Sequence, residues 1–183
     1  MRERKETINL VTANIVSFVI LAVAAIACLV PYYLIWGTVS NGTSVFEAHP
    51  IKSLIFLLLL VVGIVVHELI HGAFWGMYAK SGFKSISFGV IWKMLTPYCH
   101  CSEPLKVKHY AIGALAPLVI LGIIPAIAGV ALHSFMTALF GVIFIASAAG
   151  DIMVAWRLRK EPAENTILDH PTEAGYLVYE PED

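Results

Sequence analysis

One long uncharged run constrains this chain more than any other feature: no Lys, Arg, Asp or Glu occurs between Glu6 and Glu47. A helix needs only about 20 apolar residues to cross the hydrocarbon core of a bilayer. Hydrophobic residues make up 58% of the 183 positions and charged residues 14%. That is more apolar surface than one small soluble core can bury. The sequence therefore excludes a soluble enzyme and indicates an integral membrane protein.

Four apolar stretches are long enough to span a bilayer with some tilt. They predict an all-α integral membrane fold with four transmembrane helices, at about residues 8–34, 53–79, 110–132 and 135–156. Residues 1–160 are interpreted as one membrane domain. Residues 161–183 carry seven acids and no Lys or Arg, which predicts a solvated, acidic cytoplasmic tail.

Basic residues are segregated among the loops. Eleven of the twelve Lys and Arg residues lie before the first span, between the second and third spans, or after the fourth, and only Lys52 lies on the other side. Because positive residues are retained on the cytoplasmic side, both termini are predicted to be cytoplasmic. The net charge of −1 implies neither a nucleic acid nor an acidic partner.

Two acidic residues interrupt the spans, Glu68 in the second and Asp151 in the fourth. An ionised residue near the bilayer centre costs on the order of 2.5–3.5 kcal/mol on insertion scales, so each needs compensation. Glu68 lies in an H-E-x-x-H pattern that starts at His67 and ends at His71, which is typical of zinc peptidases. At 3.6 residues per turn, the two imidazoles lie on one helix face about 40° apart. Both can therefore reach one metal ion.

The roles of Glu68 and Asp151 follow from helix geometry and from what a zinc site needs. Glu68 is rotated about 100° from His67, so it can stand beside the metal as a candidate general base rather than a ligand. Zinc catalysis needs a third protein ligand and an open position, and Asp151 is the remaining intramembrane acid. One Zn²⁺ with both carboxylates ionised and both histidines neutral sums to zero charge. The alternative for Asp151 is a helix-packing or proton-relay carboxylate.

Depth and local composition both support Asp151 as the partner of the histidines. The second and fourth spans run toward the same basic side. His71 lies roughly 13 Å from Lys80 and Asp151 roughly 9 Å from Arg157, at 1.5 Å per residue. The run of small residues at 146–150 lets helices approach closely enough to share a metal.

The motif in the second span, followed far downstream by an aspartate in another span, resembles the intramembrane zinc metalloproteases of the site-2 protease type. The chain is more closely similar to a bacterial family of zincin membrane peptidases that carry a domain of unknown function. The stretch from Pro97 to Val107 is similar to that family's loop. The likeness covers about residues 50–160.

The resemblance implies that His67, His71 and Asp151 are zinc ligands and that Glu68 is the catalytic base. It also implies a multi-pass protein of the bacterial cell membrane. Site-2 proteases commonly carry an Asn shortly after a Gly-Pro in the span between the two zinc-binding spans. Here Pro117 is preceded by Ala and followed by no such Asn, so the oxyanion-stabilising group is unidentified.

The loop between the second and third spans alternates apolar and small or polar residues from Ser85 to Met94, which predicts a strand. A second strand is expected over 98–102, giving a short β-hairpin. Its edge could pair with an extended substrate segment, and the alternative is an amphipathic hairpin lying on the membrane surface. His100 is a candidate oxyanion or substrate-binding residue. A second metal at Cys99 and Cys101 is not expected, because ligands one residue apart alternate sides in a strand.

These features predict a zinc-dependent intramembrane endopeptidase that hydrolyses a peptide bond of a membrane-associated protein. Its partners would be a membrane protein or peptide substrate and the lipid bilayer. The alternative is a non-catalytic metal-binding membrane protein, such as a transporter, a sensor or an inactive peptidase-like scaffold. A transporter should carry polar ligands along a path through several spans, whereas this chain concentrates them at one depth. The oligomeric state is left open.

Overall fold

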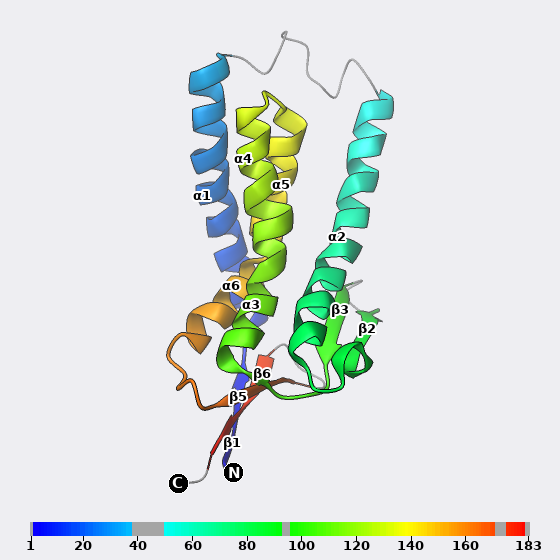
Figure 1. Cartoon of the computed structure of the whole chain (residues 1–183). Coiled ribbons are helices and arrows are strands. Elements are labelled where there is room, and N and C mark those ends of the chain that lie inside the picture. Colours follow the sequence, from blue (N-terminus) through cyan, green and yellow to red (C-terminus); the bar gives the residue numbers. More distant parts are fainter. Residues whose placement is uncertain (1, 38–49, 93–95, 171–174, 182–183) are drawn as a thin grey trace.

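The computed structural model describes residues 2–37, 50–92, 96–170 and 175–181. The chain is mostly helical and carries two small antiparallel sheets. Both termini, the hairpin and the four-stranded sheet gather at one end of the helices (Figure 1). The helical elements are α1 (Leu10–Trp36), α2 (Pro50–Tyr78), η1 (Gly82–Ser85), α3 (Val107–Pro117), η2 (Leu118–Ile123), α4 (Ile124–Ala131), α5 (Phe135–Ser147) and α6 (Ala149–Leu158). The strands are β1 (Arg2–Thr7), β2 (Ile86–Ile91), β3 (Thr96–Cys101), β4 (Leu105–Lys106), β5 (Thr166–Asp169) and β6 (Gly175–Glu180).

Three helical stretches are long and apolar enough to cross a membrane, and a bent pair can form a fourth. The first is α1, which begins where the Asn9 side chain accepts the backbone N–H groups of Val11 and Thr12. It ends at Gly37, whose positive φ of 78° suits a residue without a Cβ. The second stretch is α2, which carries both histidines of the motif.

The third stretch runs over Val107–Ala131 and is not a uniform α-helix. After Pro117 the chain passes through the π-helical segment η2 before α4 continues. Proline has no N–H to donate within a helix, so a local change of helical pitch is the expected response.

The predicted fourth span is bent rather than straight. Helices α5 and α6 meet at the buried Ala148 with an angle of 50°. The Ser147 hydroxyl donates to the Phe144 carbonyl at 3.0 Å, and serines that bond back to the preceding turn bend helices. The break makes Asp151 part of the first turn of α6, where the helix dipole favours a negative charge.

The predicted hairpin is present. Strands β2 and β3 pair antiparallel with Ile86 opposite Cys101 and Phe88 opposite Cys99. The predicted strand end at Lys93 and Met94 lies outside the described residues. The hairpin packs on α2 beside Gly72, where an added Cβ would stand 2.6 Å from the Phe88 ring. A side chain at that position would push the hairpin away from the helix.

The C-terminal segment differs from the expected solvated tail. In its described part, β5 and β6 pair with each other, and the four-stranded sheet has the order β1-β6-β5-β4. Ile167 and Val178 are fully buried and Tyr176 is 1% exposed, all in a core with residues of α2 and α3. Residues alternate between more and less buried along β5 and β6, but the acids and prolines around these strands hide that alternation in the sequence. Burial of these apolar side chains stabilises the segment in place.

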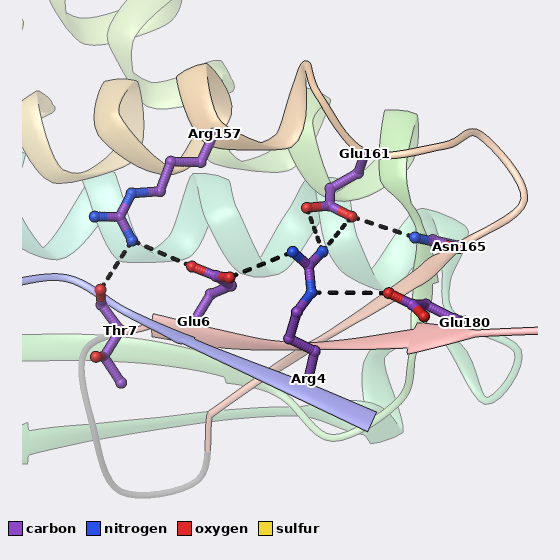
Figure 2. Close-up of polar contacts among 7 residues, drawn as sticks. All are labelled: Arg4, Glu6, Thr7, Arg157, Glu161, Asn165 and Glu180. Atoms are coloured by element: carbon purple, nitrogen blue, oxygen red, sulfur yellow. Dashed lines mark hydrogen bonds and ion pairs between the residues drawn. The ribbon is translucent and has the colours of Figure 1, made fainter. Parts of the chain in front are cut away.

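A polar network ties the first strand to the segment that follows α6 (Figure 2). The Arg4 guanidinium donates to both Glu161 oxygens at 2.6 and 2.7 Å and lies 3.8 Å from Glu180. The hydrogen bond with Glu161 raises the pKa of Arg4. Arg157 of α6 lies 3.6 Å from Glu6, which is on β1 with Arg4. Although far apart in sequence, the chain's two ends are therefore joined at the base of the helices.

Candidate metal centre

Three of the predicted site residues converge at the end of α2 nearest the hairpin. One potential ligand atom from each of His67, His71 and Asp151 lies within 4.8 Å of the other two. The nearest Asp151 oxygens are 3.2 Å from His67 Nε2 and 3.4 Å from His71 Nε2. Both histidines are buried. Residues 84 positions apart in the sequence, His67 and Asp151, thus meet at one point.

His71 is oriented by groups on its far side. Its Nδ1 lies 2.9 Å from the Gly113 carbonyl oxygen, so the N–H at Nδ1 donates there and Nε2 faces Asp151. The Trp75 ring stacks on the imidazole at 5.0 Å between centroids, with 15° between the planes. Trp75 in turn donates its Nε1–H to the Tyr110 carbonyl at 3.0 Å and stacks on the Tyr110 ring. Such outer contacts fix the tautomer and ring orientation of a metal-binding histidine.

The donor set suits a metal ion of the zinc type. Two imidazole nitrogens and one carboxylate oxygen are the ligands of many catalytic zinc sites, which keep a further position open. The hydrogen bond to the Gly113 carbonyl also suits metal binding, because it uses the Nδ1 proton of His71 and leaves the Nε2 lone pair available for a metal ion. No other group of three or more His, Cys, Asp or Glu residues with this spacing occurs in the described part of the chain.

Glu68 lies beside the cluster and lines a small cavity. The cavity has a volume of about 170 Å³ and is lined by Ile64, His67, Glu68, Pro97, Phe144 and Ser147. It therefore joins α2, the hairpin strand β3 and the end of α5. The Glu68 carboxylate accepts a hydrogen bond from the backbone N–H of Cys99 on β3. The hairpin is thus in direct contact with the proposed base.

His100 lies on β3 but does not join the histidine and aspartate cluster. Its Nδ1 lies 3.8 Å from an Asp169 oxygen. Asp169 is a buried residue of β5 that accepts hydrogen bonds from the Cys101 N–H at 2.8 Å and from the Tyr110 hydroxyl. The candidate oxyanion role of His100 stays a prediction.

The two cysteines of the hairpin fit a structural role. Burial raises the pKa of both Cys99 and Cys101, with further increases from nearby carboxylates. A thiol rather than a thiolate is therefore the dominant form at neutral pH, and the thiolate is the form that binds metals and attacks electrophiles.

Sequence reasoning missed the groups that support the ligands. In the sequence, Gly113, Trp75 and Tyr110 look like ordinary helix residues. His71 and Trp75 are held by hydrogen bonds to the backbone carbonyls of Gly113 and Tyr110, and a backbone carbonyl carries no sequence signal. Asp169 could have been found only through the Thr166–Asp169 alternation, which places its side chain on the same face as the buried Ile167.

One comparison with known proteins gives a match. A family model described as “Putative zincin peptidase” matches residues 58–166, more than half of the chain. The matched region contains His67, Glu68, His71 and Asp151, and it ends before Asp169. No curated protein and no solved structure matches the chain.

Proposed function

Since the chain belongs to the “Putative zincin peptidase” family, we propose that it is a zinc-dependent intramembrane endopeptidase. The observation that carries the proposal is the convergence of His67, His71 and Asp151, with the His71 Nδ1 held by the Gly113 carbonyl. The long apolar helices that bring these residues together support a site within a membrane. The segregation of basic residues supports cytoplasmic termini.

In this proposal His67, His71 and Asp151 hold one Zn²⁺ ion. When bound, zinc supplies Lewis acidity that polarises a peptide carbonyl and acidifies water. Glu68 accepts the proton of the attacking water and passes it to the leaving amine. The Cys99 N–H donates to the Glu68 carboxylate and so holds it against the hairpin.

The proposed substrate is a membrane-associated protein with a segment that unwinds near the cytoplasmic side. The cavity of about 170 Å³ beside Glu68 has room for one side chain, and its walls are chiefly apolar. Pro97 on β3 forms part of that wall. An extended segment bound at the hairpin would therefore enter the cavity next to Glu68, which supports the hairpin as the element that holds the substrate.

The experiment compares zinc content and cleavage in purified full-length variants. Asp151→Ala and His67→Ala should lose zinc, because two ligands hold the ion much more weakly than three. Glu68→Gln should retain one zinc per chain and lose peptide cleavage, because the amide cannot accept a proton. The matched control is Glu164→Gln, which alters an exposed acid that does not line the cavity.

Three results would contradict the proposal. Full zinc content in Asp151→Ala would mean that this residue is not a ligand. Undiminished turnover in zinc-loaded Glu68→Gln would mean that it is not the base. If the wild-type chain binds one zinc but cleaves no membrane-embedded peptide, the non-catalytic metal-binding alternative replaces the peptidase.

A further inference from the structure

Asp169 occupies an unusual place for a residue of an acidic C-terminal segment. It is 8% exposed, and a buried carboxylate is costly unless hydrogen bonds or charges compensate it. Its two oxygens are used by partners from two different elements. Oδ2 accepts the Cys101 N–H of β3 at 2.8 Å, and Oδ1 accepts the Tyr110 hydroxyl of α3. His100 on β3 adds a contact at 3.8 Å.

Both partners of Asp169 lead to the candidate metal centre. Cys101 is two residues from Cys99 on the same strand edge, and the Cys99 N–H donates to Glu68. The pairing of Ser102 N–H with the Ser85 carbonyl directs the Cys99 and Cys101 N–H groups away from β2. The strand edge that meets Glu68 is therefore the edge that Asp169 holds.

The second partner of Asp169, Tyr110, is linked to His71 through stacked rings. Tyr110 stacks on Trp75, and Trp75 stacks on His71. The Tyr176 ring of β6 lies next to the Tyr110 ring, with 6.3 Å between their centroids and 50° between their planes. The C-terminal sheet thus touches the hairpin on one side of the site and the rings behind His71 on the other.

We propose that Asp169 is a positioning residue that clamps the hairpin edge and α3 to the C-terminal sheet and so holds β3 against Glu68. This inference rests on the proposed peptidase function for its consequence in catalysis. Asp169 lies beyond the matched family region, which ends at residue 166, whereas its partners Cys101 and Tyr110 lie within it. In this proposal the C-terminal segment supports the candidate metal centre rather than forming an appended tail.

The geometry makes a prediction that does not depend on activity. The Cys101 side chain is 1% exposed, and its backbone N–H is bound to Asp169. Loss of a hydrogen bond to a charged acceptor should favour local opening of the strand by about tenfold or more. The rate at which maleimide modifies Cys101 should rise by that factor in Asp169→Ala, measured by mass spectrometry on the full chain in detergent.

The variants separate positioning from general folding. Asp169→Asn keeps the shape and one acceptor oxygen, so its labelling rate should fall between those of wild type and Asp169→Ala. Glu164→Gln should match wild type. All three should retain one zinc per chain, because Asp169 contacts none of the three proposed ligands. With a quenched fluorescent peptide of extended apolar sequence as probe, kcat/KM should fall about tenfold in Asp169→Ala.

Three outcomes would overturn the proposal. Cys101 could stay as protected in Asp169→Ala as in wild type. Zinc could be lost together with Cys101 protection in both Asp169 variants, which would indicate a general structural role. Alternatively, kcat/KM could remain at the wild-type value while Glu68→Gln is inactive, which would refute positioning but leave the peptidase intact. If wild type does not cleave the probe, the peptidase proposal fails, and the labelling rates still test the clamp.

Discussion

The substitution Gly113→Ala tests whether the support behind His71 matters for metal binding. An added Cβ at this position would stand 2.1 Å from Trp75 Cδ1 and 2.2 Å from Trp75 Nε1, where ordinary contacts begin at 3.4 Å. Trp75 has no simple retreat, because its ring lies between those of His71 and Tyr110. The tryptophan or the α3 backbone must therefore shift, and either movement disturbs the hydrogen bond from His71 to the Gly113 carbonyl.

The expected magnitude has two parts. Overpacking in a filled interior typically costs about 1–3 kcal/mol of folding free energy. Loss of the outer partner of a ligating histidine typically lowers metal affinity by about 10–100-fold. We expect Gly113→Ala to weaken zinc binding within that range, measured by chelator competition on detergent-solubilised full-length protein.

Gly150→Ala is the matched control. Gly150 is also helical and is adjacent to the proposed ligand Asp151, but a Cβ there would meet no atom within 4 Å. Alanine in place of a helical glycine should stabilise the fold by about 0.5–1 kcal/mol and leave zinc affinity unchanged. Equal zinc affinity in the two alanine variants would refute the assigned role of Gly113 and its carbonyl.

Three further predictions concern the sheet that joins the chain ends. A double-mutant cycle on Arg4→Ala and Glu161→Ala should give a coupling free energy of about 0.5–1 kcal/mol that shrinks with added salt, since the pair is partly solvent-exposed; zero coupling at low salt would contradict it. Ile167→Ala should destabilise the fold by about 2–5 kcal/mol and expose the C-terminal segment to proteolysis, whereas a solvated tail would show no change. Burial raises the pKa of Tyr176 to about 12, so folding stability should fall as pH rises from about 10 to 12, because the unfolded phenol ionises first. Phenolate absorbance should show this late titration, and Tyr176→Phe should lose that absorbance step together with the part of the stability loss that Tyr176 contributes.

The sequence predicted the parts of this protein that follow from strong local rules. Long apolar runs predicted the helices, and alternation predicted the hairpin. The spacing of His67 and His71 fixed their common helix face, and the cost of an isolated acid pointed to Asp151. These arguments succeed because each rests on one helix or on the exclusion of charge from an apolar environment.

The remaining features depend on contacts between distant segments. The bend at Ala148 arises from a serine that bonds to its own helix, and many serines occur in straight helices. The C-terminal strands can be recognised only from their pairing with β1 and β4, because the acids and prolines of this segment are typical of a solvated tail. The support of His71 comes from the Gly113 carbonyl, and every residue has a carbonyl. Tertiary pairing therefore decided these features.

The central claim is that two imidazoles and one carboxylate of this chain hold a single zinc ion. X-ray absorption spectroscopy of the zinc-loaded full-length protein tests it most directly. We predict a first shell with nitrogen and oxygen ligands at about 2.0–2.2 Å and two imidazole scattering patterns, with zinc content falling in Asp151→Ala. A sulfur shell at about 2.3 Å, or full zinc occupancy when His67 and His71 are both replaced by alanine, would contradict the account.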